Sequence, residues 1–579
     1  MNAVTLVRAA LLGALAAACA APQTGSGAGN GGFQYYGIHH VSWSPYEYTY
    51  ATATASRNDL AATNANWAGV LVTWYQANIT ASTIAASNTQ TPTDAAVEQA
   101  ITELHGKGIK VMLKPHVDVL DGTWRGNINP VDVDGWFSSY IQFIVKYAQM
   151  AAAQNVEMFC IGTELKTVSG SANQVRWIGV INAIRAVYSG PLTYAANASA
   201  AGDEFTSVSF WDQLDLLGMD AYFPLTGQSD PTLEQLVAAW HGNVNKLDLV
   251  STVLNFAASH AKPVIFTEIG YMSTSGTNTA PWNYSLAGSY DPTEQRNCMD
   301  AMFTAFSPYS SRMLGVFWWD WPVAPPAPGD LSYNPRGKPA ASLLLAWQSA
   351  VDPHNAVTND ASFSTAAIAP GTIVNLWGAS LASGTQVFTQ FPLALAMQGT
   401  TVTINGIPAP LFFVSPQQVN AQMPFEVSPG VAIAEVDSSS GIALTRFNVA
   451  AQGPGIFTTN GGGTGDGALL NAVTFAPVTS SQPIAAGDYI AIYCTGLGAV
   501  VPAGTTGAAA ATPPPATAVT PQVQIDGQNV PVFGSVLAPG YVGLYQVNAQ
   551  VPANLAPGAH QLQLVVAGTG SNIVTLATK

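Results

Sequence analysis

Short apolar runs alternate with amphipathic stretches from Tyr35 to about Gln348. A strand that is buried on both faces is apolar throughout, so these runs predict parallel strands. Strands are predicted at Tyr35–His40, Gly69–Tyr75, Lys110–Val119, Val156–Leu165, Leu192–Asn197, Leu214–Phe223, Pro263–Tyr271 and Gly315–Trp321. Helical spacing of apolar residues predicts helices at Asp94–His105, Trp136–Ala153, Gln174–Tyr188, Leu233–His260, Thr293–Phe306 and Ala340–Trp347.

This alternation indicates an α/β architecture. Eight strands within roughly 315 residues suit a (β/α)8 TIM barrel, which we assign to residues 33–350. A doubly wound open sheet is the alternative. It is disfavoured because no glycine-rich phosphate loop follows the first strand.

After Asp352 charged residues become rare, and turn signals recur at short intervals, which is typical of an all-β fold. Three motifs recur after about 120 residues, which indicates an internal repeat. They are Ile373–Trp377 with Tyr489–Tyr493, Val402–Gly406 with Val523–Gly527, and Gln418–Pro424 with Gln546–Pro552. We therefore predict two immunoglobulin-like β-sandwich modules, residues 351–465 and 466–579. Asn405-Gly406 and Asp526-Gly527 are predicted hairpin turns.

The first 32 residues have the pattern of an export leader followed by a flexible tether. Arg8 precedes the apolar run Ala9–Ala18, which is too short to span a bilayer but suits a signal peptide. Ala18-Cys19-Ala20 fits either cleavage after small residues or a lipoprotein signal in which Cys19 is lipidated. We expect a secreted protein or a surface lipoprotein, with no membrane span.

The net charge of the chain restricts the kinds of molecule that it is expected to bind. The chain carries 18 Lys and Arg and a formal net charge of −15, so nucleic acid and anionic membranes are not expected partners. Uncharged polymers remain, and 14 Trp supply flat apolar faces for stacking on sugars. The cysteines after Cys19 lie far apart and form neither a disulfide framework nor a metal-ligand cluster. No metal or organic cofactor is expected.

Two apolar strands each end in one carboxylate, Glu164 and Glu268. The carboxyl ends of barrel strands converge on the active-site face. Hydrolysis of a glycosidic bond requires two carboxyl groups, one on either side of the scissile bond. Glu164 and Glu268 are therefore the candidate catalytic pair. The structural alternative is that each pairs with a Lys or Arg of the barrel.

Other polar residues follow neighbouring strands. Lys114, His116 and Asp118 share one face of the third strand, and Asp220 and Tyr222 share one face of the sixth. All five are candidate substrate-binding residues. The first three could instead form an internal salt-bridge network, and Tyr222 could be a packing residue.

Aromatic residues near strand ends are candidate sugar platforms. Trp319 is favoured over Trp318 and Trp321, which could equally belong to the core. Trp74 at the end of the second strand is a further substrate-binding candidate. His39, His40 and Trp43 after the first strand are weaker ones.

Residues 33–348 resemble glycoside hydrolase family 113, a clan A family of (β/α)8 barrels whose characterised members include β-1,4-mannanases. The matching motifs are Lys114–Asp118, Cys160–Leu165, Asp220–Tyr222, Phe266–Gly270 and Trp318–Trp321. The resemblance implies retention of anomeric configuration, with Glu164 as acid/base and Glu268 as nucleophile. Most of the clan has Asn immediately before the acid/base, whereas this chain has Thr163.

Residues 352–579 are similar to repeated β-sandwich tail modules of secreted bacterial proteins, marked by Gln-Val-Asn-Ala-Gln. The combined expectation is a bacterial retaining glycoside hydrolase that cleaves β-1,4-linked polysaccharide such as mannan or glucomannan. The alternatives are a hydrolase of another β-glycan and a non-catalytic carbohydrate-binding protein of the cell surface.

Overall fold

The computed structural model describes residues 32–200, 202–348 and 357–579. Its chain divides into two compact units, one that ends at residue 350 and one that follows it. The predicted signal peptide and Cys19 lie outside the described residues. None of the helices in the described ranges combines the length and the apolarity that crossing a membrane requires.

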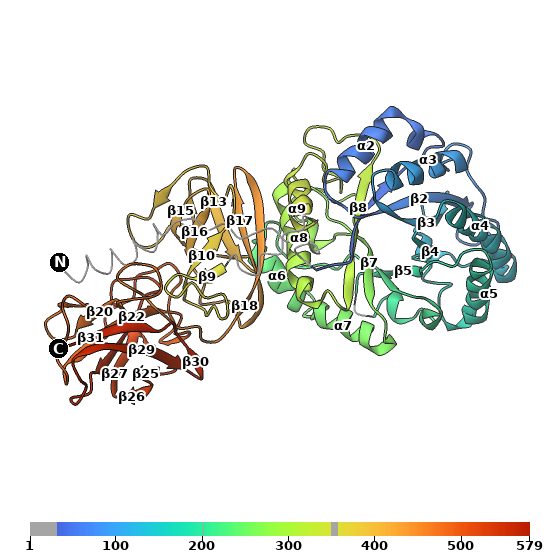
Figure 1. Ribbon diagram of the computed structural model, residues 1–579. Helices are drawn as coiled ribbons and strands as arrows, with labels where there is room; N and C mark the ends of the chain where they lie inside the picture. Colours follow the sequence, from blue (N-terminus) through green and yellow to red (C-terminus); the bar gives the residue numbers. More distant parts are fainter. Residues whose placement is uncertain (1–31, 201, 349–356) are drawn as a thin grey trace. The chain divides into compact units, whose positions relative to one another are not determined.

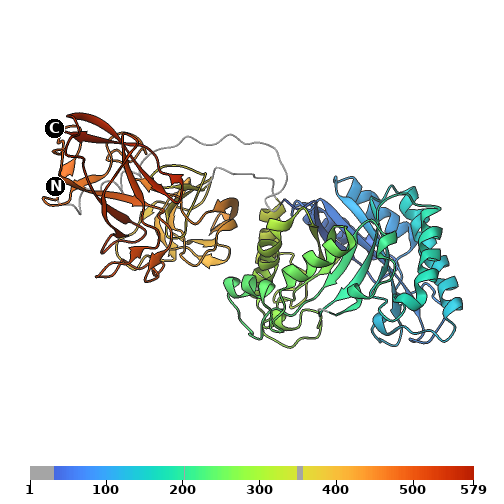
Figure 2. The same ribbon diagram turned by 90° about the horizontal axis from the view of Figure 1, so that it is seen from below.

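The first unit is a closed barrel of eight parallel strands in sequence order, with helices on its outside (Figures 1 and 2). The strands are β1 (Tyr35–Val41), β2 (Trp67–Gln76), β3 (Lys110–Val119), β4 (Met158–Thr163), β5 (Leu192–Ala198), β6 (Leu217–Ala221), β7 (Val264–Ile269) and β8 (Met313–Pro322). The helices are α2 (Ala51–Ala61), α3 (Asp94–His105), α4 (Val133–Ala153), α5 (Gln174–Arg185), α6 (Leu233–His241), α7 (Leu249–His260), α8 (Pro292–Phe306) and α9 (Pro339–Gln348). The predicted barrel is confirmed.

The barrel interior is apolar at one end and polar at the other. A buried cluster closes the end where the strands begin; it contains Tyr35, Trp67, Met112, Met158, Cys160, Ala195, Leu216, Ile265 and Phe317. The buried polar residues Lys114, His116, Asp220 and Glu268 come later along their strands. The apolar end therefore supplies a rigid base for a polar site at the carboxyl ends of the strands.

Two helices differ from the prediction. Helix α2 was not predicted, because its buried face includes Ser56 and Arg57 and so lacks an apolar stripe. The predicted helix Leu233–His260 is two helices. Between them the Asn243 side chain accepts hydrogen bonds from the backbone N–H groups of Asn245 and Leu247, both at 3.0 Å, which turns the chain before α7 begins.

The second unit contains only strands and loops within residues 357–579. The first half forms two sheets, with strand orders β11-β15-β16-β10-β9 and β12-β13-β17-β18, and β14 pairs with β13. The strands are β9 (Val357–Asn359), β10 (Ile373–Trp377), β11 (Gln386–Val387), β12 (Ala396–Met397), β13 (Thr400–Ile404), β14 (Ile407–Pro408), β15 (Leu411–Val414), β16 (Gln418–Gln422), β17 (Gly430–Ser438) and β18 (Gly441–Val449).

The second half repeats this design with two further sheets, ordered β21-β20-β22-β28-β27-β24-β23 and β26-β25-β29-β30, to which β19 and β31 add. Its strands are β19 (Gly455–Ile456), β20 (Leu469–Asn471), β21 (Pro477–Val478), β22 (Tyr489–Thr495), β23 (Val500–Val501), β24 (Ala516–Thr517), β25 (Gln522–Ile525), β26 (Gln528–Val530), β27 (Val532–Leu537), β28 (Tyr545–Gln550), β29 (Gly558–Val566), β30 (Thr569–Gly570) and β31 (Val574–Thr578).

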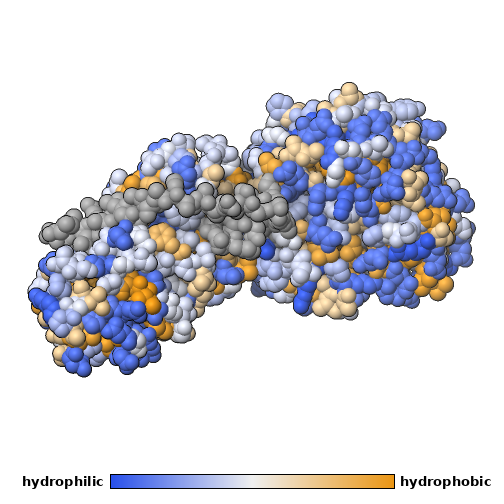
Figure 3. All heavy atoms as spheres, in the orientation of Figure 1, coloured by the Kyte–Doolittle hydropathy of each residue, from blue (hydrophilic) through white to orange (hydrophobic). Residues whose placement is uncertain are grey.

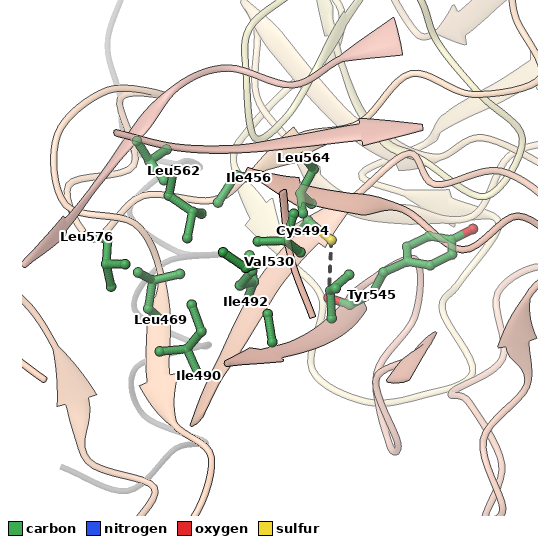
Figure 4. Packing of buried hydrophobic residues seen from close by; sticks show 14 of the residues in the cluster. Ile456, Leu469, Ile490, Ile492, Cys494, Val530, Tyr545, Leu562, Leu564 and Leu576 are labelled. Carbon is green, nitrogen blue, oxygen red and sulfur yellow. Dashed lines mark hydrogen bonds between the residues drawn. The ribbon is translucent and has the colours of Figure 1, made fainter. Parts of the chain in front are cut away.

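The repeated motifs occupy equivalent positions. β10 pairs antiparallel with β16, and β22 pairs antiparallel with β28. Each half has its own core, and Figure 4 shows that of the second, where Ile456 packs with Leu469, Ile492 and Leu564. Ile456, which lies before the predicted boundary at 465, packs in the core of the second half.

The Gln-Val-Asn-Ala-Gln motif places polar side chains inside the first module. Asn420 donates to Asp360 at 2.9 Å and to Asn375 at 2.5 Å, and Gln418 donates to Asn420 at 2.8 Å. Asp360 is 1% exposed. Burial raises the pKa of Asp360 to about 7, against the hydrogen bonds from Asn375 and Asn420, which lower it.

The second unit should lose stability between about pH 4 and pH 7. The unfolded Asp360 releases its proton near pH 3.9, whereas the folded carboxyl keeps it until about pH 7, so rising pH favours unfolding across this window. Scanning calorimetry of the full chain should show one transition whose Tm falls across this range. Asp360→Asn should make that transition less dependent on pH. An unchanged pH dependence in this variant would contradict the assignment.

Candidate active site

Glu164 and Glu268 line one cavity of about 520 Å³. Glu164 directly follows β4, and Glu268 is the penultimate residue of β7. Tyr222 and Trp319, both predicted, line the same cavity. Further lining residues that the sequence analysis did not single out include Trp124, Arg125, Asn197, Trp282 and Tyr333.

Glu268 is held by a cation and a phenol. Its Oε1 accepts a hydrogen bond from Lys114 Nζ at 2.5 Å, and its Oε2 accepts one from the Tyr222 hydroxyl at 3.0 Å. The Lys114 ammonium also lies 3.3 Å from Asp220 Oδ1. Both predicted strand faces thus contribute to the site, and they do so by contacting Glu268.

Burial dominates the electrostatics of this group. Lys114 and Asp220 are both fully buried. Burial alone would lower the pKa of Lys114, but the charges of Asp220 and Glu268 outweigh it and raise that pKa, which keeps the ammonium charged. Burial and the charge of Glu268 raise the pKa of Asp220 well above its usual value. The Lys114 ammonium therefore contacts two carboxyl groups, those of Asp220 and Glu268.

Two buried histidines of the site are neutral. Burial and nearby cations lower the pKa of His116 and that of His39 well below the usual value. His39 donates from Nε2 to the Thr267 carbonyl at 2.7 Å. The His116 ring stacks on Trp319 with an interplanar angle of 8°, and its Nε2 lies 3.8 Å from Glu268 Oε1. The His39 ring also contacts that of Trp319, with centroids 5.6 Å apart, so both imidazole rings pack against this tryptophan.

Glu164 has different partners. Its Oε2 accepts a hydrogen bond from Trp124 Nε1 at 3.1 Å, and its Oε1 accepts one from the Asn197 amide at 2.9 Å. The nearest cation is Arg125, 3.8 Å from Oε2. That guanidinium is held by Asp118 at 2.8 and 2.7 Å. The predicted residue Asp118 thus acts on the site through Arg125.

Trp74 does not line the cavity. Its indole N–H donates to the Tyr147 hydroxyl of α4 at 2.9 Å, and its ring packs on Phe143. Alternation along β2 therefore places Trp74 on the outer face of the barrel.

The weaker candidate residues lie in different environments, some in the core and one at the surface. His40 is buried between Arg57 and the Trp321 carbonyl, whereas Trp43 is exposed with its ring 6.1 Å from that of Trp319. Trp318 and Trp321 belong to the core, because each is 1% exposed.

The additional lining residues come from strand ends and loops. Asn197 lies at the end of β5, Trp124 and Arg125 follow β3, and Trp282 and Tyr333 lie on the loops after β7 and β8. Only Asn197 had a sequence signal, because it is the polar residue at the end of an apolar run.

A (β/α)8 barrel that presents two carboxyl groups and aromatic side chains in one cavity has the construction of a glycoside hydrolase. The sequence model of Glycoside Hydrolase Family 113 matches residues 40–335. The chain therefore belongs to glycoside hydrolase family 113, and it is a retaining glycoside hydrolase of clan A.

A search of solved structures found mannanases that are similar to part of this chain. The GH113 β-mannanase of Alicyclobacillus acidocaldarius is 30% identical, with a TM-score of 0.48, and the match covers 54% of this chain and 96% of that one. Another GH113 β-1,4-mannanase is 25% identical, with a TM-score of 0.48 and 55% and 98% covered. An endo-β-1,4-mannanase of Thermotoga petrophila is 10% identical, with a TM-score of 0.36 and 72% and 97% covered. No curated protein matches the sequence.

Substitutions of Trp319 and Trp74 should distinguish a tryptophan that lines the cavity from one that packs on the outer face of the barrel. Trp319→Ala should raise KM about tenfold, because the loss of ~1.4 kcal/mol of stacking corresponds to that factor. Trp74→Phe should leave kcat/KM within about twofold while lowering Tm, since it removes one partly buried hydrogen bond worth about 1 kcal/mol. Steady-state kinetics and thermal unfolding measure both. A tenfold rise of KM in Trp74→Phe would place Trp74 in the binding site.

Proposed function

We propose that this hydrolase cleaves β-1,4-linked mannan or glucomannan by double displacement, with Glu268 as nucleophile and Glu164 as acid/base. The observation that carries the proposal is that both carboxyl groups line one cavity with unlike partners. Glu268 bonds directly to a buried ammonium, whereas Glu164 bonds to two neutral N–H donors.

The environment of Glu268 suits a nucleophile. The Lys114 ammonium holds one carboxyl oxygen, and the Tyr222 hydroxyl fixes the direction of the second oxygen. In the first step a carboxylate oxygen forms a bond to the anomeric carbon as the glycosidic bond breaks. The product is a glycosyl ester, in which the negative charge of Glu268 is lost.

The environment of Glu164 suits an acid/base. In the first step its carboxyl group gives a proton to the departing oxygen, and in the second it takes a proton from the water that attacks the glycosyl ester. Trp124 and Asn197 can hydrogen-bond to its oxygens in both protonation states, because each is a neutral N–H donor. The two contacts fix the position of both oxygens of the carboxyl group.

The lining of the cavity favours an uncharged sugar. Of the cations that line it in the described part of the chain, Arg125 pairs with Asp118, and Lys166 pairs with Asp203 at 2.7 Å. Neither is free to bind an acidic sugar. Trp319, Tyr333 and the half-exposed Trp282 supply aromatic faces instead. The choice of mannan rests on family membership.

We further propose that the enzyme acts outside the cell, because its first residues have the pattern of an export leader and Cys19 is placed for lipidation. The face of the barrel turned to the viewer in Figure 3 carries mainly hydrophilic residues, with hydrophobic ones scattered among them. The β modules are proposed to space the barrel from the envelope.

Reducing-sugar release should identify the substrate. The protein should act on mannan and glucomannan, and Glu164→Gln and Glu268→Gln should each lower kcat by about a thousandfold or more, since each removes a group that takes part in bond making or breaking. A panel that includes β-glucan and xylan measures the preference. Activity on glucan alone would mean that the substrate is a β-glucan rather than a mannan. Activity that survives both substitutions would mean that other residues are catalytic. Binding without turnover would favour a carbohydrate-binding protein.

A fluorinated substrate should label the nucleophile. A deoxyfluoro mannoside with a good leaving group slows release of the glycosyl-enzyme more than its formation, so the ester should accumulate on Glu268. Mass spectrometry of peptic peptides should place the added sugar on the peptide that contains Glu268. Tyr222→Phe should still be labelled, but more slowly, and label on any other carboxylate would contradict the assignment.

A further inference from the structure

We propose that Glu204 is a positioning residue for the acid/base Glu164. The inference rests on the proposed function, which gives Glu164 that role. Glu204 begins a short 3-10 turn, Glu204–Thr206, after β5. It is fully buried and is not one of the residues that line the cavity. Its carboxylate therefore lies behind the cavity wall, where it can act on the reaction only through other residues.

The first connection runs through Tyr194. Glu204 Oε1 accepts a hydrogen bond from the Tyr194 hydroxyl at 2.5 Å, and that hydroxyl accepts one from the Leu165 N–H at 2.8 Å. Leu165 directly follows Glu164, whose φ of 51° lies in the left-handed region that a side chain with a Cβ disfavours. The acceptor for Leu165 therefore holds the chain in the turn that carries Glu164 into the cavity.

The second connection runs through Asn197. Glu204 Oε2 accepts a hydrogen bond from the Asn197 backbone N–H at 2.8 Å, and the Asn197 side chain donates to Glu164 Oε1 at 2.9 Å. Ser169 also donates to Glu204 Oε1, at 2.9 Å. One carboxylate thus fixes both the backbone that follows Glu164 and the amide that holds its side chain.

Burial dominates the electrostatics of Glu204. Burial and, to a smaller extent, the charge of Glu164 raise the pKa of Glu204 to about 7, against the hydrogen bonds from Tyr194, Asn197 and Ser169, which lower it. Burial raises the pKa of Tyr194 well above its usual value, so the phenol keeps the proton that it donates. The neighbouring cation Lys166 pairs with Asp203. The donors to Glu204 are thus neutral groups of the two connected segments.

The test compares two leaving groups in Glu204→Gln. The introduced amide NH2 faces either Tyr194 or the Asn197 N–H, so one connection is lost. Cleavage of polysaccharide needs a proton from Glu164, whereas a dinitrophenyl β-glycoside of the same sugar leaves without one. We expect kcat/KM to fall about 10- to 100-fold on polysaccharide and by about threefold or less on the aryl glycoside.

Azide gives a second readout. Azide attacks the glycosyl ester without a general base, so it should raise kcat for the dinitrophenyl substrate in Glu204→Gln and release a β-glycosyl azide. The unsubstituted enzyme should not respond. A purely structural role for Glu204 would change neither the dependence on the leaving group nor the response to azide.

Two further variants serve as controls. Glu294 is also a buried carboxylate that accepts backbone N–H groups, from Gly276 at 2.7 Å and Asn278 at 3.1 Å, but it lies in the region after β7. Glu294→Gln should affect both substrates equally and show no azide response. Tyr194→Phe breaks the first connection alone and should reproduce the selective loss, which provides the test if Glu204→Gln does not fold.

Equal losses on both substrates without azide activation, in folded Glu204→Gln or in Tyr194→Phe, would overturn the inference. The outcome is distinct from a failure of the proposed function. If the unsubstituted chain cleaves no β-glycan, the proposed function fails. If azide activates Glu164→Gln but neither Glu204→Gln nor Tyr194→Phe, the function stands and Glu204 has no positioning role.

Discussion

A buried ammonium, that of Lys114, holds the floor of the cavity together. It contacts both Asp220 and Glu268, and all three groups are almost fully removed from solvent. Moving a charge out of water is costly, and a buried ion pair often contributes little net stability. Its value here is geometric, because β3, β6 and β7 must keep their relative positions for the Lys114 ammonium to contact both carboxyl groups. The orientation of Glu268 therefore follows from the closure of the barrel itself.

The other carboxyl group is held in a different way. Glu164 directly follows β4, and its partners come from a loop residue, Trp124, and from Asn197 of β5. None of these contacts requires Glu164 to be charged. Two carboxyl groups in one cavity can thus serve opposite tasks, because one is paired with a buried cation and the other is held by neutral donors. Arg125 does not remove this difference, since its guanidinium bonds to Asp118.

The sequence predicted the structure best where a single physical constraint, such as burial on both faces, determines the residue pattern. Barrel strands are buried on both faces, so their apolar runs and the single glutamates that end two of them could be recognised directly. The sequence pattern did not predict helix α2, because Ser56 and Arg57 occupy its buried face. The sequence does not determine the side of the barrel that Trp74 faces, because an aromatic residue near a strand end can face either side; in the structure it packs against Tyr147 and Phe143 of α4. Trp124, Trp282 and Tyr333 lie on loops, where no periodicity connects a residue to the cavity that it reaches.

The position before the acid/base differs from that of most of the clan. Most of the clan has Asn there, and this chain has Thr163, which is buried and does not line the cavity. The amide that bonds to Glu164 comes instead from Asn197 on the neighbouring strand. Adjacent parallel strands deliver their ends to the same edge, so either strand can supply a donor to one carboxyl oxygen. Between these two positions, only Asn197 lines the cavity, so a substrate contact at this edge of the barrel would come from Asn197 rather than from Thr163.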